Sequence, residues 1–163
     1  MLKDVLTYDL DVVFCGTAKG KKSADSGFYY AHAGNKFYKI LFDAGFTPHR
    51  LVPETCYQIN QHKIGLTDLV HKQSGNDRQI NKSSYEVDLF SKKMIEFQPK
   101  FIAFTSKTAA SFALGFNGKT RHINYGLADK VIGKSKIFIL PSTSGAAARF
   151  WAPEYWRDLR KMI

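Results

Sequence analysis

The sequence contains little cysteine, and this shortage excludes one class of protein. Only two of its 163 residues are cysteines, Cys15 and Cys56, which is too few for the disulfide framework of a small secreted domain. They fall in segments that we expect to be a buried strand and a helix, without a paired spacing. We therefore predict reduced thiols in a cytoplasm-like compartment.

Metal-ligand spacing and long apolar runs are also missing. The five histidines show no spacing with cysteines or carboxylates that is typical of a metal site, so we predict no metal ion, no iron–sulfur cluster and no other cofactor. No apolar run approaches the roughly 20 residues of a membrane-spanning helix. Residues 1–4 lack the layout of a signal peptide, and we expect a soluble protein without a membrane partner.

Acidic residues are outnumbered. Against 14 Asp and Glu stand 24 Lys and Arg, which gives a formal net charge of +10. Such a balance favours an anionic partner such as nucleic acid, although charged side chains often do no more than solvate a surface. The 44% of hydrophobic residues are enough for a full core, and we expect a single domain over residues 1–163.

Three short apolar runs predict strands that are buried on both faces. They are Val12–Phe14, which Gly16 ends, Phe101–Phe104 and Lys136–Leu140. The expected helices are 35–44, 53–62, a segment that Ser83 or Ser84 caps and that ends near Pro99, 108–114 and 153–162. Residues 64–70 read as a turn or a short strand, and 71–82 as an exposed loop.

Alternating strands and helices predict an α/β fold, a three-layer sandwich with a short, mostly parallel central sheet flanked by helices. In such folds the ligand lies beyond the carboxyl ends of the strands. Four segments fall at that edge in the predicted topology: 16–20, 65–68, 105–106 and 141–145. We expect the functional site there.

Three sequence segments carry a family resemblance. They are Phe14–Gly20 (FCGTAKG), Gly27–Tyr38 with its aromatic cluster, and the loop Pro141–Gly145 (PSTSG). Their order and spacing resemble the mismatch-specific uracil-DNA glycosylase and thymine-DNA glycosylase branch of the uracil-DNA glycosylase superfamily. The resemblance extends from Asp9 to Leu159.

The resemblance implies a uracil-DNA glycosylase-like fold and a monofunctional DNA glycosylase of base excision repair. Such an enzyme flips uracil or another deaminated base out of DNA and hydrolyses its N-glycosidic bond without a cofactor. It implies DNA as the partner, a monomer, and a cytoplasmic, nucleoid-associated location, or a nuclear one in a eukaryote.

Two loops of small residues are suited to hold phosphates through backbone amides and hydroxyls. The candidate DNA-binding residues are Gly16, Lys19, Gly20, Ser23, Ser142, Thr143, Ser144, Gly145, Ala146 and Arg149. Residues 16–20 could equally be a tight strand exit, and 142–144 could cap the following helix. In the resembled family the loop at Ala146 enters the duplex, for which Ala146 is a poor wedge. Arg149 could serve as the wedge if the loop shifts, and the alternative is an arginine that contacts phosphate or solvent.

Four residues are candidates for contact with the base: Thr17, Ala18, Tyr30 and His32. The resemblance selects Tyr30 as the ring that stacks on the extruded base, a contact worth about 1–3 kcal/mol. The alternative is that Tyr30 belongs to the core. His32 could donate to a leaving base oxygen, and its alternative role is structural.

The catalytic candidates follow from one substitution. Hydrolysis requires a positioned water and a group that stabilises a cationic sugar, and the family's water-positioning Asn corresponds to Ala18, which offers neither. Asp68 is the first substitute, with a helix or turn cap as its alternative. Asn35 is the second, because some sister branches use the Asn at this helix start; its alternative is an N-cap.

Two other functions stay open at this point. Ala18 and the small Ala146 also fit a family member with weak or no catalysis that binds mismatched or damaged DNA. The third possibility is an unrelated doubly wound protein that binds a nucleotide at its glycine turn.

Overall fold

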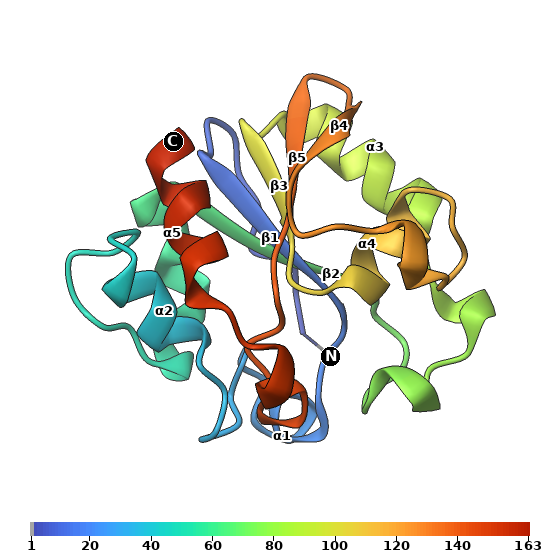
Figure 1. The fold of residues 1–163 in the computed structure, drawn as a ribbon. Coiled ribbons are helices and arrows are strands. Elements are labelled where there is room, and N and C mark those ends of the chain that lie inside the picture. The colour runs from blue at the N-terminus through green and yellow to red at the C-terminus, as the bar shows by residue number, and fades with distance from the viewer. Residues whose placement is uncertain (1) are drawn as a thin grey trace.

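The computed structural model describes residues 2–163 and contains a five-stranded sheet (Figure 1). Its strands are β1 (Val12–Ala18), β2 (Ile64–Val70), β3 (Phe101–Phe104), β4 (Gly126–Ile132) and β5 (Ser135–Ile139), in the spatial order β2-β1-β3-β5-β4. All neighbours are parallel except β4, which runs antiparallel to β5. The predicted α/β fold with a mostly parallel sheet is confirmed.

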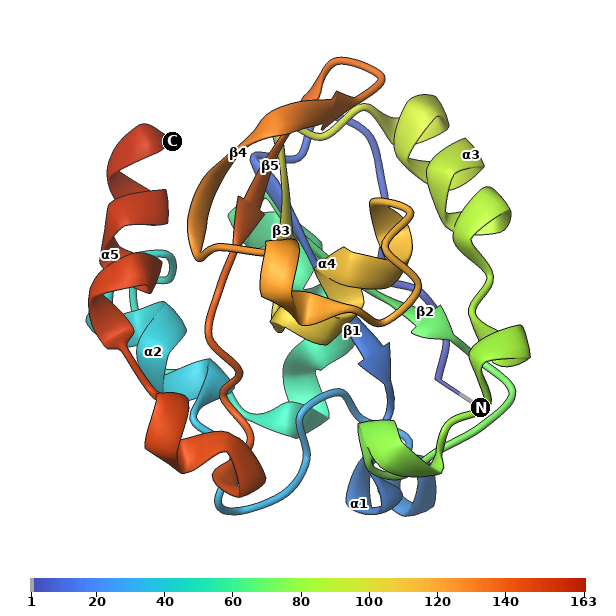
Figure 2. The same ribbon diagram turned by 45° about the vertical axis from the view of Figure 1, so that its right-hand side comes forward.

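Helices cover both faces of this sheet (Figures 1 and 2). The α-helices are α1 (Lys21–Ser26), α2 (Phe37–Asp43), α3 (Val87–Phe97), α4 (Lys107–Ala113) and α5 (Pro153–Met162). The 3-10 segments are η1 (Pro53–His62), η2 (Asp77–Gln79), η3 (Lys82–Ser84), η4 (Thr120–His122) and η5 (Gly145–Phe150). Side chains of α2, η1 and α5 share one hydrophobic core, and those of α3 and α4 share the other.

β1 supplies side chains to both cores because successive residues of a strand point to opposite faces. Val12 and Phe14 belong to the core under α2 and α5, whereas Val13 and Cys15 belong to the core under α3 and α4. All four are fully buried. Burial of each large apolar side chain stabilises the fold by about 1.5–3 kcal/mol, so the sheet centre is a rigid base for the strand ends.

α5 fixes the position of the loop that follows β5. Pro153 stands at its first turn, where a missing amide N–H costs nothing. Trp156 is fully buried, stacks on Phe14 with ring centroids 5.4 Å apart, and donates its Nε1–H to the carbonyl of Pro141 at 3.2 Å. The small-residue loop after β5 therefore starts from an anchored backbone.

β1 and β2 are longer than their predicted counterparts. β1 continues through Gly16 to Ala18, because its backbone pairs with β2 as far as Val70. Residues 64–70, read from the sequence as a turn or short strand, are buried at all seven positions as β2. Gly65 lies inside this strand beside Val13, so its predicted place at the functional edge is wrong.

The start of α3 also differs from the prediction. Ser83 and Ser84 belong to η3 and do not cap α3, which begins after Glu86. The amide of Glu86 donates to the carbonyl of Leu69 at 2.9 Å, which holds the chain away from a helical path until that residue. The loop predicted over 71–82 contains η2 and buries Ile80.

The helix α1 and the strand β4 were not predicted. α1 has the polar sequence KKSADS and β4 has an exposed edge with few buried positions, so neither shows the apolar periodicity on which the predictions rest. Among residues 2–163, none of the helices has the length and apolar character to cross a membrane.

Candidate active site

A cleft of about 1020 Å³ lies at the carboxyl ends of the parallel strands. Both predicted small-residue loops contribute to its lining, together with Asp68 and segments that begin at Tyr29, Gly75 and Thr105. The chain segment that leads into α2 contacts the loop after β5, where the amide of Lys36 donates to the carbonyl of Thr143 at 3.0 Å. The cleft is therefore bounded by chain segments that are far apart in the sequence.

Gly16 occupies the centre of a row of three residues across the sheet. It pairs with Asp68 of β2 on one side. On the other side Thr105 follows β3, and its amide donates to the carbonyl of Cys15 at 3.0 Å. A Cβ atom at Gly16 would lie 2.8 Å from Asp68 Oδ1 and 3.4 Å from Thr105 Oγ1. The missing side chain thus lets the Asp68 carboxylate and the Thr105 hydroxyl come close to the backbone of Gly16, and we call this corner of the cleft the notch at Gly16.

Asp68 is a buried carboxyl within β2, not a loop residue, and the alternative of a turn cap is therefore wrong. Burial raises its pKa to about 7, and the negative charge of Asp4 acts in the same direction. The nearby charges of His71 and Lys19 oppose this rise. Near neutral pH, Asp68 is therefore divided between its acid and its carboxylate.

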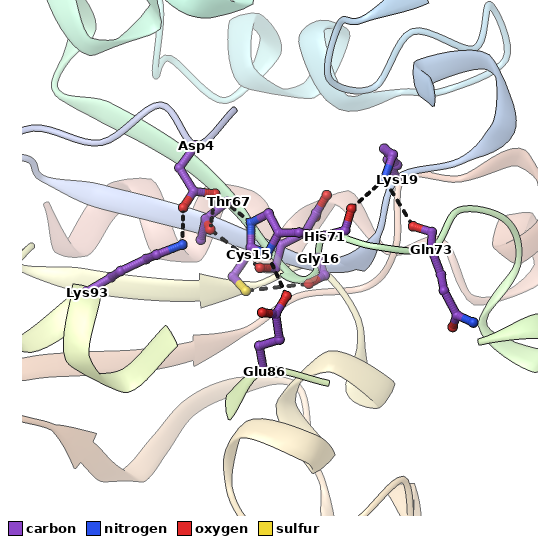
Figure 3. Close-up of polar contacts among 10 residues, drawn as sticks. Asp4, Cys15, Gly16, Lys19, Thr67, His71, Gln73, Glu86 and Lys93 are labelled. Carbon is purple, nitrogen blue, oxygen red and sulfur yellow. Dashed lines mark hydrogen bonds and ion pairs between the residues drawn. The ribbon is translucent and has the colours of Figure 1, made fainter. Parts of the chain in front are cut away.

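His71 lies between two carboxylates beside this wall of the cleft (Figure 3). Its Nε2 is 2.9 Å from Asp4 Oδ1 and its Nδ1 is 3.2 Å from Glu86 Oε1. The hydrogen bond with Asp4 is the main cause that raises the pKa of His71, against the effect of its burial. An imidazolium at this place is a fixed positive charge close to Asp68.

Asp4 connects the N-terminal segment to this imidazole. Burial raises the pKa of Asp4, but hydrogen bonds from His71, Lys93 and Thr67 outweigh it and lower the pKa to about 2 (Figure 3). Sequence reasoning missed this cluster because Asp4 and His71 are 67 positions apart. No local pattern joins residues at such a separation.

Lys19 and Thr17 attach the loop after β2 to the end of β1. The Lys19 ammonium donates to the carbonyls of His71 at 2.9 Å and Gln73 at 3.1 Å (Figure 3), and the Thr17 hydroxyl donates to Asp77 Oδ1. Lys19 lines the cleft, but its ammonium is already hydrogen bonded. Its predicted phosphate contact would have to compete with these carbonyls.

Tyr30 adopts a left-handed backbone conformation with φ of 52° and contributes to the cleft wall. One face of its ring stacks on Phe37, with centroids 3.8 Å apart and planes 16° apart. Within the described residues, the buried hydroxyls of Tyr30 and Tyr29 have no hydrogen-bond partner. The core alternative for Tyr30 is thus partly met, and base stacking on its other face stays a prediction.

Asn35 and His32 line the same cleft. The side-chain oxygen of Asn35 accepts the amide hydrogen of Phe37 at 3.0 Å, but the N-cap of α2 is Lys36. Asn35 therefore supports the first turn of α2 without being its N-cap residue. His32 is exposed, and its Nδ1 accepts from the amide of Gly34 at 2.9 Å. Nε2 is then the nitrogen that carries the proton in neutral His32. The catalytic role of Asn35 stays a prediction.

The loop after β5 uses its hydroxyl oxygens for its own backbone. Ser142 Oγ accepts from the amide of Ser144 at 3.1 Å, and Ser144 Oγ accepts from the amide of Ala146 at 3.3 Å. Thr143 is buried. Capping occupies the oxygens as acceptors, while each hydroxyl hydrogen is still a possible donor to phosphate.

The remaining DNA-binding candidates fall into two groups. Ser23 is buried, with its Oγ accepting from the amide of Ala31 at 3.1 Å, and Gly20 is exposed at the entry to α1. Both line the cleft, as does Ala146, whereas Gly145 and Arg149 are outside its lining. The structure thus brings most, but not all, of the predicted set to one place.

Two features of the cleft were missed from the sequence. Phe150 lines the rim with 52% of its surface exposed, and the Arg149 guanidinium lies over its ring at 4.6 Å. Thr105 was placed at the correct edge but was not recognised as a partner of Gly16. Phe150 is the last residue of η5 and Thr105 follows β3. Neither belongs to a sequence pattern that indicates such a role.

No group of three His, Cys, Asp or Glu side chains in residues 2–163 is arranged to hold a metal ion. The cleft instead offers carboxylate, hydroxyl and backbone groups together with lysines 21, 22 and 107 and Arg78. This set is suited to a polyanion and to acid–base chemistry.

Comparisons with known proteins agree with this architecture. Residues 4–160 match the model of the Uracil DNA glycosylase superfamily. The fold is similar to the solution NMR structure of a "putative Uracil DNA glycosylase" from Methanosarcina acetivorans, with a TM-score of 0.69 and 20% sequence identity. That match covers 99% of this chain and 95% of the other chain.

Proposed function

We propose that this chain, which belongs to the uracil DNA glycosylase superfamily, is a DNA glycosylase of the mismatch-specific branch that removes uracil or a related deaminated base. It would act as a monomer, by hydrolysis and without a cofactor. The sequence resemblance over Phe14–Gly20 and Pro141–Gly145 supports the branch, and the basic charge of the chain supports DNA as the partner.

The observation that carries this proposal is the buried carboxyl of Asp68 in the wall of the cleft. A general base works best when its pKa is near the operating pH, and burial raises the pKa of Asp68 to about 7. A carboxylate there can accept a proton from water and can also stabilise positive charge on the sugar. Both roles compensate for Ala18, which has no polar side chain.

Substrate binding would start at the strand ends. The hydroxyls of Ser142 and Ser144 and the amides near Gly20 would hold phosphates, while the nucleotide rotates out of the stack into the cleft. The base would lie against the free face of Tyr30, and His32 would approach one of its oxygens. Phe150 at the rim has the size and apolar character to fill the space that the base leaves.

In the chemical step, the C1′–N bond breaks and its electron pair leaves with the base. The oxygen of a water molecule forms the new bond to C1′, and one water proton passes to the Asp68 carboxylate. Solvent protonates the released base anion, to which Nε2–H of His32 can donate a hydrogen bond. Atoms and charge balance without a metal or a second reactant.

The competing candidate is a protein that binds damaged DNA without cleavage. Ala18 lines the cleft and presents only a methyl group there, and by the sequence resemblance it corresponds to the family's Asn. Turnover therefore separates the two functions.

The test is base release from oligonucleotides that carry uracil or hypoxanthine, as single strands and opposite each normal base. We expect multiple turnovers by the wild type, a loss of about 10²–10⁴-fold with Asp68→Asn, and a smaller loss with Asn35→Ala. Asp25→Asn, at an exposed position on α1, is the matched control and should leave the rate unchanged.

The last variant, Ala18→Asn, introduces the polar group that the resembled family carries at this position. If no protein releases a base, including Ala18→Asn, the glycosylase assignment is wrong. Tight mismatch binding under those conditions would support the binding function instead.

A further inference from the structure

The notch at Gly16 is surrounded by polar groups from three elements. Asp68 Oδ1 stands on the β2 side and Thr105 Oγ1 on the β3 side, each near the place of the missing Cβ atom. Phe14, Leu66 and Ala103, two residues earlier in the three strands, share the core under α2. Because side chains alternate, Gly16, Asp68 and Thr105 face the same side, toward Tyr30 and Phe37.

A second observation concerns the Tyr30 hydroxyl. This group is buried, lines the same cleft and has no hydrogen-bond partner in residues 2–163. The pKa of Tyr30 is raised, first by burial and then by the negative charge of Asp68, while a hydrogen-bonding contact with the Thr105 side chain lowers it. The hydroxyl therefore lies within electrostatic reach of both groups that flank the notch.

Buried polar groups nearly always have a partner, and a missing one often marks a site for water or ligand. Thr105 has only a long hydrogen bond, 3.4 Å, to the carbonyl of Cys15. A buried water molecule needs two to four polar partners. Asp68, Thr105 and Tyr30 provide three, and all of them line the cleft together with Gly16.

We propose that the notch at Gly16 binds the attacking water, and that the hydroxyls of Thr105 and Tyr30 position it beside Asp68. The proposal rests on the proposed glycosylase function and names the groups that carry out its water step. The site would lie two residues before Ala18 on the same face of β1, which explains how hydrolysis proceeds without the family's Asn.

The roles of the four residues follow from their chemistry. One water hydrogen points to Asp68, which accepts it as the oxygen attacks C1′. The second hydrogen points to the oxygen of Thr105 or Tyr30, so the lone pair of the water is directed into the cleft. Gly16 is required because a Cβ atom would lie 2.8 Å from Asp68 Oδ1 and would displace the carboxylate.

Three variants test the site. Thr105→Val and Tyr30→Phe remove one hydroxyl each with nearly unchanged shape. Gly16→Ala places a methyl group 2.8 Å from Asp68 Oδ1. Thr55→Val, in η1 and away from the cleft, makes the same chemical change as Thr105→Val at an exposed hydroxyl and serves as the control.

The first readout is the single-turnover rate of base release from a single strand containing uracil. We expect losses of about 10-fold or more for Thr105→Val and Tyr30→Phe, and about 10²-fold or more for Gly16→Ala. Affinity for a strand with 2′-fluorinated deoxyuridine, in which the electron-poor sugar resists cleavage, should change less than twofold. Thr105→Val with Tyr30→Phe should lose less than the product of the single losses, because both hydroxyls hold one water.

The second readout does not require catalysis. NMR titration of the Asp68 carboxyl should show an altered midpoint in Thr105→Val and Tyr30→Phe and an unchanged one in Thr55→Val. A high-resolution crystal structure should contain a water in the notch of the wild type and none in Gly16→Ala.

The outcomes distinguish failure of the water site from failure of the glycosylase function. An active wild type with unaffected Thr105→Val and Tyr30→Phe, or an occupied wild-type notch that is equally occupied in Gly16→Ala, overturns the water site and leaves the glycosylase function intact. A wild type that releases no base from any substrate overturns the function and, with it, the assignment of this water as nucleophile.

Discussion

Nε2 of His71 lies 2.9 Å from Oδ1 of Asp4, and this contact joins the N-terminal segment to the residue that follows β2. Asp4 raises the pKa of His71 and so favours the charged imidazolium, whose charge lowers the pKa of Asp68. The chain segment before β1 therefore acts on the cleft through one histidine. Removal of that positive charge should be felt at Asp68, three residues away along the chain.

His71→Gln is the first prediction. The amide keeps polar contacts but loses the charge, so the pKa of Asp68 should rise above about 7 and the pH–rate midpoint should move upward. The wild-type rate should increase with pH as Asp68 ionises. A pH–rate profile of both proteins from pH 5 to 9 measures this, and identical midpoints would contradict the electrostatic link.

The stability effect of His71 has a defined sign. Its pKa is raised in the folded state, so its contribution is fully present below the ordinary value of 6.5 and disappears as pH rises through the folded value. His71→Gln should therefore lower Tm more at pH 5.5 than at pH 9. Denaturation curves at both pH values test this.

Asp68→Asn is the second prediction, and its effect on stability has the opposite direction to its effect on activity. The pKa of Asp68 rises from 3.8 to about 7 on folding, so the folded state binds the proton more tightly. Relative to a neutral side chain, the group has no effect below pH 3.8, and its ionisation destabilises the fold increasingly until about pH 7, by an amount on the order of a few kcal/mol.

The neutral amide avoids that cost. We expect Asp68→Asn to raise Tm at pH 8 and to leave it nearly unchanged at pH 4, while base release is lost. Thermal unfolding at the two pH values is the measurement, with Asp25→Asn as the control for charge removal. A Tm at pH 8 below that of the wild type would show that Asp68 stabilises the fold.

Much of the fold could be predicted because its signals are local. The strand at Phe101–Phe104 and the helix α5 were located to within a residue from apolar runs and from the Pro153 start signal. By contrast, α1 is polar, and both α1 and β4 are mostly exposed. Such elements depend on their attachment to the remainder of the fold.

The site was less predictable for the same reason. The sequence placed Asp68 at the correct edge of the sheet, but it gave no sign that the carboxyl is buried within a strand opposite Gly16. The partnership of Gly16 with Thr105 depends on the strand order β2-β1-β3, which brings β3 beside β1. Register across a sheet is a long-range property, whereas spacing along the chain is local.

Lys21 and Lys22 give the third prediction. They are exposed on α1, line the cleft and directly follow Gly20, so they are suited to contact DNA phosphates. The double variant Lys21→Ala and Lys22→Ala should weaken DNA binding. It should also reduce the slope of the logarithm of the binding constant against the logarithm of the salt concentration by about 0.7–0.9 for each lost contact. Lys134→Ala, in the β4–β5 turn, is the control and should retain the slope.

Phe150 gives the last prediction. Its exposed ring at the rim of the cleft is suited to fill the gap in a duplex after the nucleotide has rotated out, and an apolar side chain is favoured there over water. A single strand has no such gap. Phe150→Ala should therefore slow base release from a uracil-containing duplex about 10-fold and leave the single-strand rate within twofold. Phe42→Ala, an exposed phenylalanine on α2 outside the cleft, is the matched control. Equal losses on both substrates would mean that Phe150 supports the cleft itself and does not enter the duplex.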